Sequence, residues 1–460
     1  MKFAHLTIAA LLASTAATVA QAQDVPAPAP QQQAQPQPQP QDQPLSVDVT
    51  NTAAKDLVIA IPAMPTSESV STPAGPTDQL GAKLAQVVED DLRNTGLFKT
   101  RGPSASRGIA YSEVTAPNYG SWSGNQAIIQ GYVRANGNGS LTVGCYLYDV
   151  LLQSELVRQG FVVSPADWRR AAHKCADAVY SKLTGEGPYF DSQVVYVAET
   201  GPKNKRRKQL AIMDQDGANH RFLTNGQSIV LTPRMSPKQN AIVYMSYTQR
   251  KPAIYVYDMG TRENRLLVSN VSLSFAPRFS PDGRFVLFSM AQAGNTDIYR
   301  IASAGGEPQR LTNSPGIDTG GSYSPDGSKI VFESDRSGTQ QLYVMNADGS
   351  NQHRISFGGG RYATPVWSPR GDLIAFTRTG GGAFRIGVMN PGGGGEKLLT
   401  NSWGDEAPSW SPNGRVLMFF RSAQGSGRPD LWSVDLTGTN ARRIPTPLDG
   451  SDPSWGPIRP

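Results

Sequence analysis

Phe279-Ser280-Pro281-Asp282-Gly283 is one of six related stretches that divide the second half of this 460-residue chain. In each, Ser-Pro or Gly-Pro follows Met or an aromatic residue, and we call this motif the Ser-Pro marker. The copies are Met235-Ser236-Pro237, Phe279-Ser280-Pro281, Tyr323-Ser324-Pro325, Trp367-Ser368-Pro369, Trp410-Ser411-Pro412 and Trp455-Gly456-Pro457. Their central residues, 236, 280, 324, 368, 411 and 456, lie 44, 44, 44, 43 and 45 residues apart. Pro with a nearby Gly favours a tight turn, so each marker predicts a hairpin.

The spacing of the markers matches a repeat of four short strands. Three apolar stretches recur between markers, as at 285–288, 298–301 and 310–312, and a fourth precedes each marker. Four strands make one propeller blade. The unit beginning at Gln193 has no marker before it, whereas the marker at Trp455 has no strands after it. Joining these ends closes a ring of six blades and removes exposed sheet edges, which an open solenoid, the structural alternative, would leave.

The first 44 residues predict export rather than a folded domain. Lys2, an apolar run from Leu6 to Val19 and Ala20-Gln21-Ala22 form a signal-peptide pattern over 1–22. The run is too short to span a bilayer, and no direct membrane insertion is expected. Residues 23–44 are rich in Pro and Gln, which predicts an extended tether.

Residues 45–185 predict a small α/β domain, so the fold class is an α+β N-terminal domain followed by an all-β six-bladed β-propeller over 186–460. Helical spacing of apolar residues occurs between Pro76 and Gly96 and again over 166–183, and strands are expected over 57–61, 127–133, 141–148 and 156–163. Cys145 and Cys175 point into one core by these patterns. They form either a disulfide or two buried, inert thiols.

The charge lies mainly on the predicted propeller. Residues 1–185 carry 13 basic and 14 acidic side chains, or −1, and residues 186–460 carry 30 and 23, or +7. Export makes nucleic acid an unsuitable partner, so none is expected. The basic run 203–208 is interpreted as a solvated loop, with contact to an acidic partner as the alternative.

No catalytic or metal-binding constellation is apparent. His173, His220 and His353 lack metal-ligand spacing, and His173 is interpreted as a helix or domain-interface residue. Asp214-Gln215-Asp216-Gly217 resembles part of a calcium loop without the later Glu ligand, so a turn between strands is expected. No enzyme activity, metal or cofactor is predicted. The competing classes are a hydrolase gated by a propeller and a propeller that binds cell-wall glycans.

The blade pattern, together with three further segments, resembles the TolB family of the Tol-Pal system. These segments are Glu89-Asp90-Asp91-Leu92-Arg93-Asn94-Thr95-Gly96-Leu97-Phe98, Trp168-Arg169-Arg170-Ala171-Ala172-His173-Lys174 and Lys182-Leu183-Thr184-Gly185. The resemblance implies a monomeric, non-enzymatic interaction hub in the periplasm. It further implies binding to the lipoprotein Pal through the propeller and to TolA through the N-terminal segment, in support of cell division and outer-membrane integrity.

Two sets of residues are predicted to carry these contacts. For TolA they are Leu45, Ser46, Val47, Asp48 and Val49, which otherwise would be an ordinary first strand of the α/β domain. For Pal they are the loops that join one blade to the next around one mouth of the channel. These comprise Ser274, Phe275, Ala276, Asp318, Thr319, Tyr362, Ala363, Thr364, Trp403, Asp405 and Glu406, with Phe275, Tyr362 and Trp403 either as exposed anchors or packed between blades.

Overall fold

The computed structural model describes residues 45–50, 57–202, 205–238, 240–248, 251–269, 273–425 and 427–460. The predicted signal peptide and tether, residues 1–44, lie outside the described residues. Within the described ranges, no helix is both long enough and apolar enough to cross a membrane. All described residues belong to one compact unit, residues 44–460.

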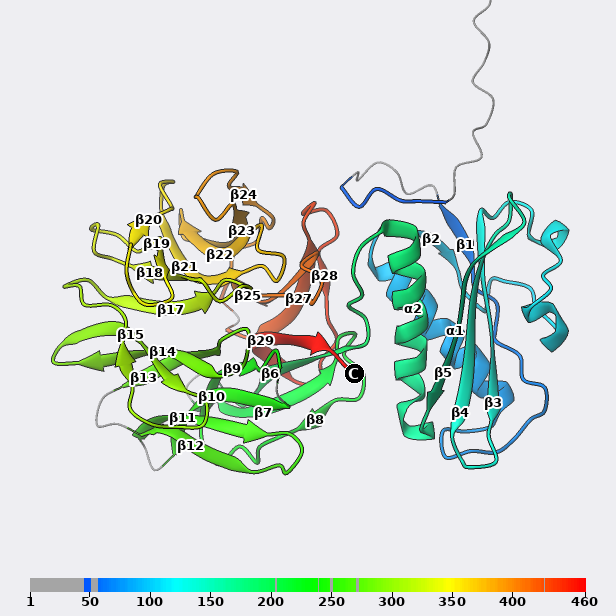
Figure 1. Cartoon of the computed structure of the whole chain (residues 1–460), viewed down its shortest axis with the longest axis horizontal. Helices are drawn as coiled ribbons and strands as arrows, with labels where there is room; N and C mark the ends of the chain where they lie inside the picture. The colour runs from blue at the N-terminus through cyan, green and yellow to red at the C-terminus, as the bar shows by residue number, and fades with distance from the viewer. Residues whose placement is uncertain are drawn as a thin grey trace, which may run out of the picture. The chain divides into compact units, whose positions relative to one another are not determined.

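The α/β domain is a five-stranded mixed sheet with two helices on one face (Figure 1). The strand order is β2-β1-β3-β4-β5, in which β1 is parallel to β2 and β3, and the remaining pairs are antiparallel. The strands are β1 (Val58–Ala60), β2 (Lys99–Arg101), β3 (Ala127–Ala135), β4 (Leu141–Asp149) and β5 (Ser154–Val163), and the helices are α1 (Thr77–Asn94), α2 (Trp168–Thr184) and the short η1 (Tyr111–Val114), η2 (Tyr119–Trp122) and η3 (Pro165–Asp167). The sequence did not predict β2, because Lys-Thr-Arg has no apolar pattern.

The apolar faces of both helices form the core of this domain. Leu84, Val88 and Leu92 of α1 are fully buried, as helical spacing predicts. The helix α2 ends where Gly185 takes the left-handed conformation, with φ of 72°. A disulfide joins Cys145 on β4 to Cys175 on α2, whose Cα atoms are 5.7 Å apart, so the first of the two alternatives for these cysteines is the one found.

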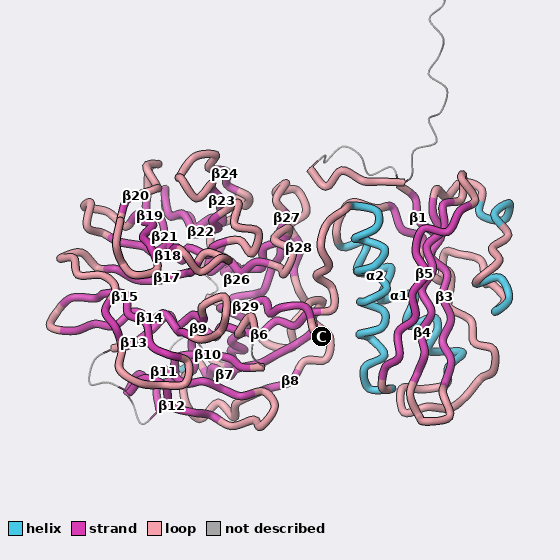
Figure 2. The backbone as a smooth tube through the Cα atoms, in the orientation of Figure 1, coloured by secondary structure: helices cyan, strands magenta, loops and turns pink. Residues whose placement is uncertain are grey.

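The remaining chain forms six four-stranded antiparallel sheets, as predicted, and Figure 2 shows the strands of these sheets joined by loops. Blade 1 is β29-β6-β7-β8, blade 2 is β9 to β12, and blades 3 to 6 follow in the order of the chain. The strands are β6 (Ser192–Thr200), β7 (Arg207–Asp214), β8 (Arg221–Phe222), β9 (Val230–Met235), β10 (Ala241–Thr248), β11 (Lys251–Asp258), β12 (Asn264–Ser269), β13 (Ser274–Phe279), β14 (Phe285–Gln292), β15 (Asn295–Ala302), β16 (Gln309–Arg310), β17 (Asp318–Tyr323), β18 (Lys329–Ser334), β19 (Gln341–Asn346), β20 (His353–Arg354), β21 (Arg361–Trp367), β22 (Ile374–Gly380), β23 (Ala383–Met389), β24 (Lys397–Leu398), β25 (Asp405–Trp410), β26 (Val416–Ser422), β27 (Pro429–Asp435), β28 (Arg442–Arg443) and β29 (Asp449–Ile458).

The ring closes as the repeat arithmetic predicts. The C-terminal strand β29 pairs antiparallel with β6, so one sheet contains the first and last strands of the propeller. Trp455 Nε1 donates a hydrogen bond to Ser192 Oγ at 2.8 Å, which adds a side-chain contact to the closure. The closing strand therefore leaves no gap between the first and sixth blades.

Each innermost strand carries a bulge where it faces the channel. The pairing with the second strand of the blade shifts register at this point in all six sheets. One residue of each bulge has a positive φ, and these residues recur three positions before the marker's aromatic or Met: Thr232, Ala276, Gly320, Thr364, Ala407 and Asp452. Such bulges bend a strand and redirect its side chains, so the same local geometry lines the channel six times.

Candidate functional site

The first mouth of the channel lies where the innermost strands begin. Their other ends, the markers of all six blades, line a single cavity and so define the opposite mouth. The residues predicted to contact Pal therefore fall on one mouth, at or just before the innermost strands β13, β17, β21 and β25.

Several of these residues are occupied by contacts inside the propeller. Asp318 and Asp405 are fully buried. Arg336 Nη2 lies 2.6 Å from an Asp318 oxygen, and Arg421 holds Asp405 with two hydrogen bonds of 2.6 and 3.0 Å. Both carboxylates are engaged in ion pairs within their own blades, Asp318 with Arg336 just after β18 and Asp405 with Arg421 of β26.

The three predicted aromatic anchors differ in exposure. Tyr362 is fully buried, and its hydroxyl donates to Glu396 Oε2 at 2.8 Å, so its prediction as an exposed anchor is wrong. Its ring packs between blades 4 and 5, the other alternative, because it lies in one core cluster with Phe376 of its own blade and Val331 and Leu342 of the preceding blade. Phe275 is half-buried, whereas Trp403 is 45% exposed and remains available to a partner.

The other predicted residues line the strand starts around a half-buried acid, Glu333. Its two oxygens accept hydrogen bonds from Thr319 Oγ1 at 2.5 Å and from the backbone N–H of Thr364 at 2.7 Å. Burial raises the pKa of Glu333. Ser274 is buried, and Ala276, Ala363 and Glu406 are half-buried.

Large exposed apolar side chains gather on the loops of this same mouth. Five of the twelve exposed large hydrophobic residues among those described lie on loops that lead into an innermost strand, with exposures of 41% to 72%. We call them the apolar rim: Ile229, Leu273, Ile317, Phe357 and Trp403. Sequence reasoning found only Trp403. The signal for the first three was their spacing, because Ile229, Leu273 and Ile317 are 44 residues apart in succession.

The N-terminal segment 45–49 is a second candidate. It is not a strand of the sheet, so its interpretation as an ordinary first strand is wrong. The backbone N–H of Val47 donates to the carbonyl of Leu183, near the end of α2, at 2.8 Å. Leu45, Val47 and Val49 are half-buried while Ser46 and Asp48 are exposed, so the alternation of apolar and polar residues in the sequence corresponds to an alternation of burial and exposure.

A cavity of about 520 Å³ lies beside this segment, between the α/β domain and blade 6. Val49 and Thr50 line it together with Tyr180 of α2 and with Arg415 and Val416 at the start of β26. The segment is thus placed where the α/β domain meets the propeller.

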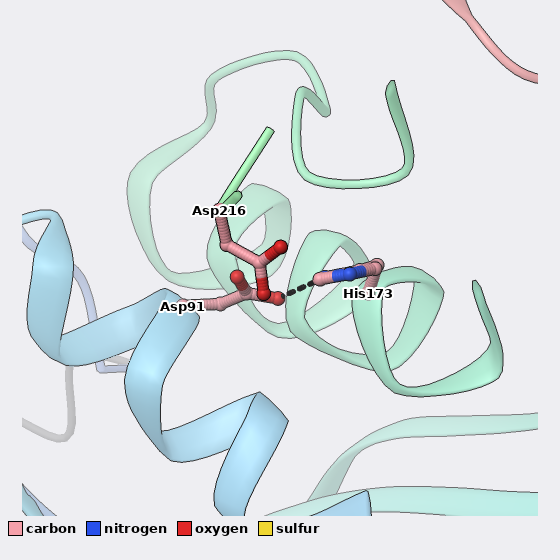
Figure 3. Close-up of side chains that lie close together, drawn as sticks. All are labelled: Asp91, His173 and Asp216. Atoms are coloured by element: carbon pink, nitrogen blue, oxygen red, sulfur yellow. Dashed lines mark hydrogen bonds and ion pairs between the residues drawn. The ribbon is translucent and has the colours of Figure 1, made fainter. Parts of the chain in front are cut away.

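A buried charge cluster joins the same two parts of the chain (Figure 3). His173 of α2 and Asp91 of α1 are both buried, and His173 Nδ1 lies 2.6 Å from Asp91 Oδ2. From the turn after β7, Gln215 Nε2 donates to Asp91 Oδ1 at 2.8 Å, and Asp214 Oδ2 lies 4.0 Å from His173 Nε2. The expected turn at 214–217 is present, and it docks on α1 and α2.

The electrostatics of this cluster favour a protonated imidazole. Burial opposes the charge, but the carboxylate of Asp91 outweighs it, with help from Asp216 and Asp214, and raises the pKa of His173 to about 9. Ligand atoms of Asp91, His173 and Asp216 lie within 4.8 Å of one another, which metal sites also show. Asp91 is already paired with His173, and Asp216 with Arg169. The arrangement is therefore an ion-pair network.

The connection between α2 and blade 1 is fixed by two further carboxylates. Asp177 of α2 accepts hydrogen bonds from the backbone N–H groups of Tyr189, Phe190 and Asp191 at 2.7, 2.8 and 3.0 Å. Burial raises the pKa of Asp177 to about 6 despite these bonds. Glu186 pairs with Arg370 at 2.8 Å and with Arg415, both next to marker turns.

We expect His173→Gln to destabilise the protein by about 3 to 5 kcal/mol at pH 6, because it leaves the buried Asp91 without a cation. The folded pKa of about 9 exceeds the ordinary value of about 6.5, so the stabilisation is complete below pH 6.5 and is lost as the pH rises through 9. Denaturant unfolding of the unsubstituted protein and of His173→Gln, measured from pH 6 to 10, should show the difference between their free energies of unfolding becoming smaller. A difference in free energy of unfolding that stays constant with pH would contradict a charged His173. The charged and polar groups that face His173 are Asp91, Asp214, Gln215, Asp216 and Arg169.

Comparison with known proteins identifies the family. The TolB beta propeller domain model matches residues 180–459, and the TolB amino-terminal domain model matches residues 45–156. The chain is 71% identical over 418 residues to a Rhizorhabdus wittichii protein and 65% identical over 418 residues to one from Zymomonas mobilis, both named Tol-Pal system protein TolB. These alignments cover 90% of this chain and 95% and 91% of the relatives. The crystal structure of TolB from Acinetobacter baumannii superimposes with a TM-score of 0.76 at 28% identity, covering 87% of this chain and 96% of that one. The chain therefore belongs to the TolB family and is a component of the Tol-Pal system.

Proposed function

We propose that this protein is a non-enzymatic periplasmic hub that binds Pal at the first mouth of the propeller and TolA through residues 45–49. In this role it would support invagination of the outer membrane at division and the integrity of that membrane. Membership of the Tol-Pal system supports partners of this kind. The three histidines beyond the predicted signal peptide serve no common site, because His173 is buried in an ion pair while His220 and His353 lie on different blades.

The apolar rim is the observation that carries the Pal site. Exposed apolar residues that cluster on one face are typical of protein interfaces. The rim surrounds a channel mouth whose ion pairs, Asp318 with Arg336 and Asp405 with Arg421, hold the strand starts rigid. A rigid frame with exposed Trp403 and Phe357 suits docking of a folded partner, because little conformational entropy is lost on binding.

The weak attachment of residues 45–49 supports the TolA site. Among the residues that the structure describes, one backbone hydrogen bond, from Val47 to Leu183, holds the segment, together with half-buried Leu45 and Val47. Such a segment can leave its place at small cost and pair with a partner as an added strand.

We also propose that the two sites are coupled through α2. One end of this helix holds His173 against blade 1, and the other holds Val47 through the carbonyl of Leu183. A partner that shifts the propeller against α2 would change the contacts of the segment. Two sites biased by one shared element meet the physical definition of allostery.

The combined substitution Ile317→Ser, Phe357→Ser and Trp403→Ala should weaken Pal binding at least tenfold, or about 1.4 kcal/mol, because it removes the central apolar contacts. The measurement is calorimetric titration with the soluble domain of Pal from the same organism. Phe222→Ser with Leu266→Ser is the matched control, since both residues are exposed apolar side chains of the propeller outside the rim. Equal loss in rim variant and control, or no loss in either, would place the Pal site elsewhere.

Deletion of residues 23–50 should abolish binding of the soluble domain of TolA, whereas deletion of residues 23–44 alone should preserve it. The second deletion removes the predicted tether and leaves Leu45 to Val49 in place. Calorimetry with both variants distinguishes the segment from the tether. Full binding after the longer deletion would refute the proposed TolA site.

A further inference from the structure

At the second mouth of the channel, where the markers converge, three blades carry a serine before the marker, one carries Val366 and two neighbouring blades carry an arginine. In the order of the chain, from blade 2 to blade 6 and then blade 1, the residue before the marker's aromatic or Met is Arg234, Arg278, Ser322, Val366, Ser409 and Ser454. Each of the three serines takes the same role. Its Oγ accepts the backbone N–H of the next marker, as Trp367 donates to Ser322 at 3.3 Å, Trp455 to Ser409 at 2.9 Å and Met235 to Ser454 at 3.1 Å.

Two guanidinium groups stand in place of hydroxyls in blades 2 and 3, and both line this mouth. Arg234 Nη1 donates to the carbonyl of its neighbour Pro233 at 2.7 Å. In the part of the chain that the structure describes, neither Arg234 nor Arg278 has a carboxylate within ion-pair distance of 4.0 Å. Both side chains are half-buried. Burial lowers the pKa of both groups, the carboxylate of Asp452 in the bulge of β29 partly offsets this for Arg234, and the charge of Arg234 lowers the pKa of Arg278 further.

An arrangement of this kind costs stability unless an anion joins it. Elsewhere in the propeller, arginines on the blades pair with acids, as Arg336 does with Asp318 and Arg421 with Asp405. Two half-buried like charges are partly desolvated and repel each other, which costs free energy unless a counter-charge offsets it, and Asp452 faces Arg234 but not Arg278. Guanidinium groups bind carboxylates through paired hydrogen bonds, so a carboxylate at this mouth would satisfy both arginines.

The walls of the mouth indicate what the carboxylate is attached to. The cavity has a volume of about 330 Å³, near the lower end of the range of about 300 to 1,000 Å³ for ligand sites. Apart from the arginines and the serines, its lining consists of the Met, aromatic, Gly and Pro residues of the six markers together with Val366 and Ile458. Rings and prolines favour an apolar body, and the serine hydroxyls are already bonded to backbone N–H groups.

We propose that the marker-side mouth is a binding site for a carboxylate with a small apolar body, held by Arg234 and Arg278. This site is separate from the proposed Pal mouth, because the markers lie at the opposite ends of the innermost strands. The carboxylate can be the free carboxyl end of a peptide or that of a free organic acid, and the two share this chemistry.

The test compares N-acetylphenylalanine with its amide, which differ only in the carboxylate, by calorimetry and by tryptophan fluorescence from Trp367, Trp410 and Trp455. We expect saturable binding of the acid and at least tenfold weaker binding of the amide. Benzoate serves as the free organic acid. If it binds as tightly as N-acetylphenylalanine, the natural ligand is assigned to free organic acids. If it binds more weakly, the ligand is assigned to the carboxyl end of a peptide. Equal responses to acid and amide, or none, would overturn the proposal.

Arg278→Met and Arg234→Met should each weaken binding of the acid at least tenfold. Arg284→Met is the matched control, because Arg284 lies in the same blade as Arg278, is 76% exposed and stands outside this cavity. In buffer without added carboxylate, Arg278→Met should unfold at the same temperature as the unsubstituted protein or a higher one, since it relieves repulsion between like charges. A marked fall in its unfolding temperature, or unchanged affinity for the acid, would show that the guanidinium is structural. Pal and TolA binding by these variants should stay unchanged, which separates this site from the proposed function.

Discussion

The buried imidazole of His173 lies where α1, α2 and the first blade meet, and its contacts with acids from three elements help to fix the α/β domain against the propeller. His173 is completely buried, so its charge is tolerable only because Asp91 bonds to it at 2.6 Å and Asp214 and Asp216 lie close by. Each of these partners comes from a different element: α1, the end of β7 and the turn that follows β7. Moving the α/β domain away from the blade would leave the buried charges of this cluster without partners. The free-energy cost of this is far larger than that of breaking a surface ion pair.

The same interface connects the two proposed binding sites. The carboxylate of Asp177 on α2 accepts hydrogen bonds from the backbone N–H groups of residues 189–191 and so fixes the chain as it enters blade 1. Residues 45–49, in contrast, rest on the far end of α2 through one backbone bond. The junction between α2 and blade 1 is held by several bonds, whereas residues 45–49 are held weakly. A small shift at the junction should therefore displace residues 45–49 before it disrupts the junction itself. The 520 Å³ cavity beside Val49 leaves room for such movement.

The architecture could be predicted from the sequence because it repeats. Six markers at near-constant spacing specify six blades, and the unmatched ends at Gln193 and Trp455 specify closure by β29 and β6. The site could be predicted only in part, because burial depends on contacts between residues distant in the chain. Tyr362 and Asp405 have the polarity of loop residues, yet they turn inward to Glu396 and Arg421. No local pattern brings Asp91 to His173, 82 positions away, or to the turn at Gln215.

In the proposed function, α2 couples the Pal mouth to the TolA segment. The most direct test is the affinity of the protein for the soluble domain of TolA, measured by calorimetry without Pal and with saturating soluble Pal. Coupled sites should show at least about a fivefold change in the dissociation constant, a coupling of roughly 1 kcal/mol. Identical dissociation constants in both titrations, with Pal binding verified, would contradict the account and leave two independent binding sites on one scaffold.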